Sequence, residues 1–127
     1  MKKVLIDTDI LIDFLRKSEP AKKIIEDVIN ENIIGLVSVI TEAELLSGKE
    51  CNKTEKKHLV EELLLLMNKL EVGSAIAKKA GELRRTHNTP LVDSLIAASA
   101  IISNSVLYTR NIRHFQKIKG LKFVAPY

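Results

Sequence analysis

The stretch Val4-Leu5-Ile6-Asp7-Thr8-Asp9 decides the fold of this chain, because it joins a short apolar run directly to a pair of acids. Consecutive aliphatic residues of this kind are typical of a strand that is buried on both faces of a parallel sheet. Helical spacing of apolar residues follows over residues 10–15. A strand that leads straight into a helix predicts an α/β fold, with its polar groups in a crevice at the strand's carboxyl end.

Strand-like and helix-like segments continue to alternate along the chain. Further strands are predicted at residues 33–39, 106–109 and 122–124. Helices are predicted from Pro20, from Thr41, and over residues 53–70, 74–86, 90–103 and 112–118. This alternation predicts a three-layer α/β/α sandwich around a mainly parallel sheet, in a single domain spanning residues 1–127.

Composition restricts the class of protein. The 127 residues are 46% hydrophobic and 28% charged, which suits a folded core with a soluble surface. The single cysteine, Cys51, excludes an intrachain disulfide and a cysteine-based zinc site. No apolar run is long enough to span a membrane, and Asp7, Asp9 and Asp13 interrupt the one segment that imitates a signal peptide. We therefore expect a cytoplasmic protein with no membrane partner, whose net charge of +4 permits a polyanionic one.

Acidic residues follow several of the predicted strands. Asp7 and Asp9 come after the first strand, Glu44 after the second, and Asp93 in the first turn of a later helix. Because parallel strands end at one edge of a sheet, these carboxylates can converge on one crevice. Residues 109–111 follow another strand and are expected at the same edge.

Each acid also has a purely structural explanation. Asp9 could cap the helix that begins at Ile10, and Thr41 with Glu44 has the spacing of a capping box. Asp93 lies where a helix dipole favours negative charge. Asp93 is nevertheless surrounded in sequence by aliphatic residues, and Asp7 ends an apolar strand, so both need a partner that offsets the cost of burying charge.

A shared cation would meet that need. An all-oxygen site of this kind suits Mg²⁺ or Mn²⁺, with Asp7 and Asp93 as ligands. Glu44 would hold a second metal or orient a water molecule, and a water held in this way hydrolyses phosphate esters. The three histidines, His58, His87 and His114, are too scattered to suggest a metal triad and are expected at the surface or at helix ends.

These same segments resemble the four motifs of PIN-domain proteins, and in particular VapC-type toxins of prokaryotic toxin–antitoxin pairs. The matching segments are residues 4–13, residues 38–48 with Glu44 as the functional acid, residues 93–100, and Tyr108-Thr109-Arg110-Asn111 with His114-Phe115 and Gly120-Leu121. They occur in the family's order and span almost the whole chain.

The resemblance implies a three-layer α/β/α fold and a Mg²⁺- or Mn²⁺-dependent endoribonuclease. It also implies a homodimer and a cognate antitoxin that blocks the acidic site with a peptide segment. One position departs from the family pattern: many PIN domains carry a fourth acid where this chain has Asn111. An asparagine can ligate a metal through its carbonyl oxygen or bind a metal-held water, but it brings no negative charge, which puts a second, tightly held metal in doubt. Asp9 and Asn111 are therefore expected to be supporting site residues.

RNA is expected at the mouth of the crevice. No acid follows Asp93, whereas Arg110 and Arg113 flank Asn111 and could bind a phosphate backbone. Thr8 and Thr109 are candidate hydroxyl contacts to the substrate. Because aromatic residues make up only 4% of the chain, extensive base stacking is not expected.

The leucine-rich segment at residues 59–70 is most simply part of the core. Leu64 and Leu65 widen its apolar surface beyond one helix face, so part of it could bind a second copy or an antitoxin.

Three other functions fit parts of the sequence. A degenerate PIN-like domain would bind RNA or protein without catalysis, and Asn111 keeps that alternative open. A haloacid dehalogenase-type phosphatase would share the Asp7-Thr8-Asp9 loop, but the late acidic pair of that class is absent. A structural module gives no reason for acids at three strand ends.

Overall fold

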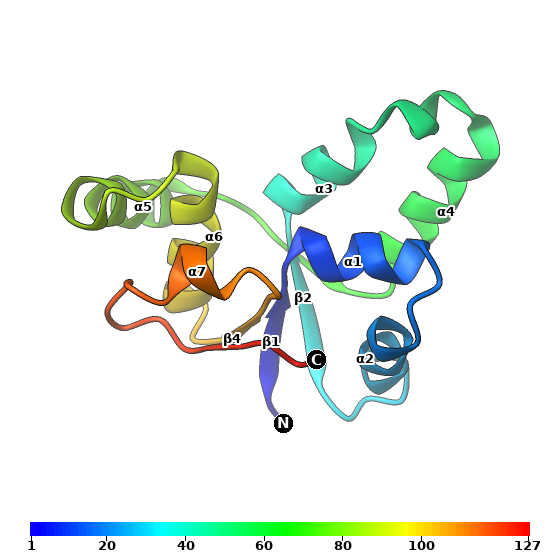
Figure 1. Ribbon diagram of the computed structural model, residues 1–127, viewed down its shortest axis with the longest axis horizontal. Helices are drawn as coiled ribbons and strands as arrows, with labels where there is room; N and C mark the ends of the chain where they lie inside the picture. The colour runs from blue at the N-terminus through cyan, green and yellow to red at the C-terminus, as the bar shows by residue number, and fades with distance from the viewer.

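The computed structural model describes residues 1–127, which fold around one five-stranded sheet (Figure 1). In chain order the strands are β1 (Lys3–Ile6), β2 (Ile34–Ser38), β3 (Asn68–Leu70), β4 (Val106–Tyr108) and β5 (Phe123–Val124). Their spatial order is β3-β2-β1-β4-β5, and every neighbouring pair is parallel. None of the helices is long and apolar enough to cross a membrane.

Helices cover both faces of the sheet, which confirms the predicted three layers (Figure 1). The first layer consists of α1 (Thr8–Leu15), α2 (Glu19–Ile29), α3 (Val39–Leu46) and α4 (Thr54–Leu65), with a short 3₁₀ helix at Lys49–Asn52. The second consists of α5 (Ser74–His87), α6 (Leu91–Ile102) and α7 (Ile112–Phe115).

The central strand β1 supplies side chains to both cores. Val4 and Ile6 pack with residues of α1, α2 and α4, whereas Leu5 packs with residues of α5, α6 and α7. All three side chains are at most 1% exposed. Burial on both faces explains why β1 reads as a continuous apolar run instead of an alternating one.

The predicted helix over residues 53–70 is wrong in its last part. Helix α4 ends at Leu65, the chain turns through Leu66 and Met67, and Asn68–Leu70 forms the edge strand β3. The tripeptide Asn-Lys-Leu has little intrinsic preference for a strand, and its pairing with β2 provides the stabilisation. Likewise, the last predicted helix is shorter than expected, because α7 ends at Phe115.

The leucine-rich segment divides between core and surface. Leu63 and Leu64 are each 3% exposed, whereas Leu65 is 81% exposed. Leu64 is therefore a core residue and not part of an interaction surface. Of the two leucines considered for such a surface, only Leu65 remains available.

The strand order places a topological switch point beside β1. The chain runs from β1 through β2 to β3 on one side, and then crosses to β4 on the other side. The carboxyl ends of β1 and β4 therefore flank a crevice that no crossover connection covers, which is where ligands bind in open parallel sheets.

Candidate functional site

A hollow of about 230 Å³ opens at this switch point. It is lined by four acids from three separate segments, together with Thr8, Asn111 and three apolar side chains; the acids are Asp7, Asp9, Glu44 and Asp93. The expected convergence of acids at one sheet edge is therefore present in the structure.

Asp7 lies at the end of β1 and caps helix α1. Its Oδ1 accepts a hydrogen bond from the backbone N–H of Thr8 (2.8 Å), and its Oδ2 accepts one from the hydroxyl of Thr109 (2.8 Å). Burial raises the pKa of Asp7 to about 6, and the negative charge of Asp9 adds to that shift. An ionised Asp7 is thus costly in the metal-free protein.

Asp9 lies in the first turn of α1 and does not cap it, because Asp7 occupies the cap position. Its Oδ2 accepts from the backbone N–H of Arg110 (2.9 Å), whereas its Oδ1 is buried and has no hydrogen-bond partner. Burial also raises the pKa of Asp9. A buried carboxylate oxygen without a donor is a site that a cation would satisfy.

Glu44 faces the hollow from α3 and does not form the capping box expected from its spacing to Thr41. Helix α3 begins at Val39, before Thr41, and its cap is the hydroxyl of Ser38. The Oε1 of Glu44 instead accepts from the hydroxyl of Thr8 at 2.6 Å, and Thr8 Oγ1 also lies 3.0 Å from Thr41 Oγ1. The buried threonine pair thus fixes one oxygen of Glu44.

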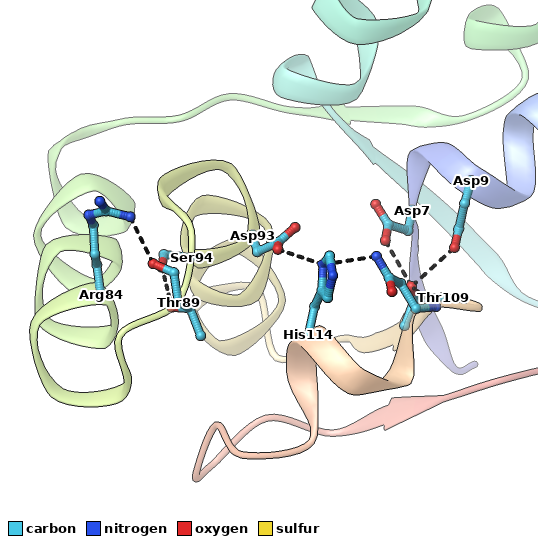
Figure 2. Close-up of polar contacts among 9 residues, drawn as sticks. Asp7, Asp9, Arg84, Thr89, Asp93, Ser94, Thr109 and His114 are labelled. Atoms are coloured by element: carbon cyan, nitrogen blue, oxygen red, sulfur yellow. Dashed lines mark hydrogen bonds and ion pairs between the residues drawn. The ribbon is translucent and has the colours of Figure 1, made fainter.

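Asp93 enters the hollow from the first turn of α6, and its partner is a histidine. Its Oδ2 lies 2.8 Å from Nδ1 of His114, which lies 2.9 Å from the side-chain Nδ2 of Asn111 (Figure 2). The predicted location of His114 at the surface or a helix end is correct, since it is exposed in the last turn of α7, but its place in the site is not predicted from the sequence. Its spacing of three residues from Asn111, one helical turn, was the available signal.

The loop before α6 is held from behind by α5. The guanidinium of Arg84 donates to the carbonyl oxygen of Thr89 at 3.0 Å, and the hydroxyls of Thr89 and Ser94 lie 2.5 Å apart (Figure 2). Thr89 and Ser94 are completely buried. These contacts fix the start of α6, and hence the position from which Asp93 projects; Arg84 and Thr89 had no predicted role.

The two arginines predicted to bind substrate do not line the hollow, and they differ in their contacts. Arg110 donates to Asp13 Oδ2 at 2.9 Å and its guanidinium stacks over the ring of Tyr127, whose hydroxyl donates to the same Asp13 oxygen (2.6 Å). The Tyr127 hydrogen bond and the Arg110 charge lower the pKa of Asp13. Arg113 is exposed and has no carboxylate partner, so its guanidinium is the freer of the two.

The donor set fits a hard divalent cation. Every acid in the hollow offers oxygen, no thiolate is present, and Asp7 and Asp9 are both desolvated. As the side chains lie, no three His, Cys, Asp or Glu groups are close enough together to share one ion. Asp7, Glu44 and Asp93 instead face the hydroxyls of Thr109 and Thr8 and the ring of His114, respectively.

Comparison with known families decides the classification. The family model of the PIN domain matches residues 4–121, nearly the whole chain. The chain belongs to the PIN domain family. The match covers every residue that lines this PIN domain's hollow, from Asp7 to Asn111.

Individual relatives agree with this classification. The chain is 32% identical to Ribonuclease VapC10 of Mycobacterium tuberculosis, over 97% of this PIN domain and 95% of the relative. It is 28% identical to a chain of a toxin–antitoxin complex from Klebsiella pneumoniae, with a TM-score of 0.81 and 98% of each chain covered. A chain of the VapBC2 complex of Rickettsia felis, at 23% identity, covers 96% of this chain and 97% of that one with a TM-score of 0.83, and shows the shared fold.

Proposed function

We propose that this PIN domain is a Mg²⁺- or Mn²⁺-dependent endoribonuclease, and the toxin of a toxin–antitoxin pair. The observation that carries the proposal is the convergence of four acids in one hollow, two of them desolvated and one with a buried unpaired oxygen. Its relatives include a ribonuclease of nearly the same length.

Asp7 and Asp93 would hold the cation, Glu44 would hold it or orient the attacking water, and Asp9 would support them. A bound Mg²⁺ or Mn²⁺ would offset the charge of these acids, stabilise negative charge on a phosphate and make a nearby water more acidic. Mg²⁺ keeps several waters and needs few carboxylates, which suits a hollow of this size.

The chain's own groups would handle the proton and the substrate. Glu44 uses Oε1 to accept from Thr8, so its Oε2 is the atom placed to accept a proton from the attacking water. The water oxygen then bonds to phosphorus, one P–O ester bond breaks, and the leaving oxygen takes up a proton from solvent. The hydroxyl groups of Thr8 and Thr109 donate their hydrogens to Glu44 and Asp7, respectively. We therefore assign the two threonines as residues that hold these acids in position and not as direct contacts to the substrate.

Arg110 and Arg113 would bind the RNA backbone at the rim. Arg113 has no competing carboxylate, whereas Arg110 would use the donors that Asp13 leaves free, since a guanidinium has five N–H groups. We therefore expect the Arg113→Ala variant to lose more RNA affinity than the Arg110→Ala variant.

We further propose a homodimer and a cognate antitoxin. A groove of about 460 Å³ between α1, α3 and α4 is lined by six apolar residues among eleven, and shares Ile12 and Glu44 with the acidic hollow. An antitoxin segment seated in this groove would reach the acids directly. The exposed Leu65 on α4 offers further apolar area for a protein partner.

The deciding experiment is cleavage of a panel of structured RNAs by purified protein with Mg²⁺, Mn²⁺ or EDTA. We expect cutting that requires metal and is abolished in Asp7→Asn and in Asp93→Asn. The matched control is Glu26→Gln, an exposed acid on α2 outside the hollow, which should cut like the wild type.

Cutting that survives both aspartate substitutions would refute the assigned site. If no RNA is cut, titration with Mn²⁺ separates the alternatives. A protein that binds Mn²⁺ through Asp7 and Asp93 needs a different RNA target, whereas a protein without Mn²⁺ affinity is a binding domain and not a nuclease.

A further inference from the structure

One ring nitrogen of His114 serves two polar neighbours. Its Nδ1 lies 2.8 Å from Asp93 Oδ2 and 2.9 Å from the amide of Asn111 (Figure 2). A carboxylate only accepts hydrogen bonds, so Nδ1 must carry a hydrogen and donate it to Asp93. A nitrogen that carries this hydrogen has no lone pair with which to accept from an amide N–H.

The two contacts are compatible only if the amide oxygen of Asn111 faces His114. The oxygen and the NH₂ group of an asparagine have nearly the same shape and exchange places on rotation about the Cβ–Cγ bond, so hydrogen-bond partners decide between them. With the oxygen toward His114, both Asn111 and Asp93 accept from Nδ1–H. The NH₂ group then takes the opposite position.

That opposite position is free of protein partners. The contact with His114 is the only hydrogen bond of the Asn111 side chain, since the residue's other two bonds are made by its backbone N–H to Thr109 and by its backbone carbonyl oxygen, which accepts from the N–H of His114. Asn111 is exposed and lines the hollow together with the acids. Its two amide hydrogens are therefore available to a molecule bound there.

We propose that Asn111 presents its NH₂ group to the hollow and donates to a phosphate oxygen of RNA, and that His114 is the positioning residue that fixes this orientation. An amide nitrogen does not ligate a cation, so Asn111 is a substrate contact and not a metal ligand. The inference rests on the proposed ribonuclease function and narrows it.

The first test reads the hydrogen on His114 directly. Long-range ¹H–¹⁵N NMR spectra of the metal-free protein distinguish a hydrogen on Nδ1 from one on Nε2. We expect Nδ1 to carry a hydrogen. A ring with its hydrogen on Nε2 alone would leave Nδ1 free to accept from Asn111 and would overturn the proposal.

The second test separates substrate from metal. RNA affinity is measured by fluorescence anisotropy with a short labelled RNA of mixed sequence in EDTA, and metal affinity by calorimetry with Mn²⁺ alone. We expect Asn111→Ala to weaken RNA binding roughly tenfold, the usual size for a hydrogen bond to a charged group, and to leave Mn²⁺ affinity unchanged. A tenfold loss of Mn²⁺ affinity with unchanged RNA binding would show that Asn111 is a ligand, and the proposal would be wrong.

The role of His114 is tested by a rescue. His114→Leu removes the donor and should weaken RNA binding several-fold, roughly half of the Asn111→Ala effect on a logarithmic scale. His114→Asn places an amide N–H near the position of Nδ1 and should restore most of the affinity. Equal losses in the two variants would show that the orientation of Asn111 does not depend on that hydrogen.

The same experiments distinguish a failure of this inference from a failure of the proposed function. Asp7→Asn should lose Mn²⁺ binding, whatever Asn111 does. Retained Mn²⁺ affinity in Asp7→Asn would refute the metal site itself, and melting curves of each variant in EDTA confirm that it is folded.

Discussion

Asp7 shows how a single residue can serve the site at the expense of the fold. It ends the most buried strand of the molecule, and its two oxygens accept from Thr8 and Thr109. Those two hydrogen bonds lower its pKa, but burial and the neighbouring Asp9 raise it by a larger amount. The resulting pKa is about 6. The charged form is thus less favourable in the folded protein than in the unfolded chain.

This imbalance predicts how stability depends on pH. Between pH 4 and pH 6, approximately, folded Asp7 keeps a proton that the unfolded chain releases, so the free energy of unfolding falls as pH rises through this window. The loss is at most about 3 kcal/mol. In EDTA, Asp7→Asn should therefore unfold at a higher temperature than the wild type at pH 7.5, and the difference should shrink at pH 4.

The gain in this variant should be smaller than the full loss, because an asparagine has one acceptor oxygen for two donors. Thermal unfolding followed by circular dichroism measures it, with Glu26→Gln as the exposed control. Equal melting temperatures of wild type and Asp7→Asn at both pH values would contradict the prediction.

At this scale the sequence identifies the acids but not their partners. Asp7, Asp9, Glu44 and Asp93 could be predicted because acids beside apolar strands and helices need a chemical reason. The pairing of Asp93 with His114 could not, since it depends on how α7 packs against α6 over a separation of 21 positions. The predicted capping box of Thr41 and Glu44 is wrong, because T-x-x-E spacing alone does not show where a helix begins.

Helices and strands of the fold differ in how much room they leave for a larger side chain at their glycines. Gly35 in β2 lies under α2, and a Cβ atom there would be 2.8 Å from one methyl carbon of Val28 and 3.3 Å from Met67 Cγ. Gly81 in α5 has no atom within 4 Å of the corresponding position. The two glycines therefore predict opposite effects of one substitution.

Gly35→Ala should lower the free energy of unfolding by about 1–3 kcal/mol, because α2 must shift away from the sheet. Gly81→Ala should raise it by about 0.5–1 kcal/mol, because alanine is the better helix former. Urea unfolding measures both. A neutral Gly35→Ala would show that α2 adjusts to the added methyl group without cost.

Helix α4 predicts a second contrast, between core and surface leucines. Leu64→Ala should cost about 2–5 kcal/mol, as expected for a buried leucine. Leu65→Glu should leave stability within about 0.5 kcal/mol, since Leu65 is 81% exposed. If α4 carries a dimer or antitoxin surface, sedimentation should show a weaker assembly for Leu65→Glu; an unchanged assembly would exclude Leu65 from that interface.

Elements with a strong pattern were predicted well, and those formed by tertiary pairing were not. Helices α5 and α6 agree with the sequence within a residue or two, because apolar periodicity and flanking signals mark them. The sequence pattern predicts the end of a helix where the structure has strand β3. The three residues Asn68–Leu70 follow a run of leucines and show no alternation typical of a strand.

For the molecule as a whole, the site should couple metal binding to stability. A ligand that binds only the folded state at about 100 times its dissociation constant adds about 2.7 kcal/mol. Mn²⁺ should therefore raise the melting temperature of the wild type and leave Asp93→Asn unchanged. An equal rise in both proteins would place the bound Mn²⁺ outside the acidic hollow.

Strand order has a further consequence for the synthesis of the protein on the ribosome. Asp7 is synthesised more than 100 positions before Thr109, which donates a hydrogen bond to it, and before Asn111, which lines the hollow with it. Every earlier stage of the nascent chain lacks β4 and half of the crevice. Under the proposed function, the growing toxin has no assembled active site beside the messenger RNA that encodes it until β4 and Asn111 have been synthesised.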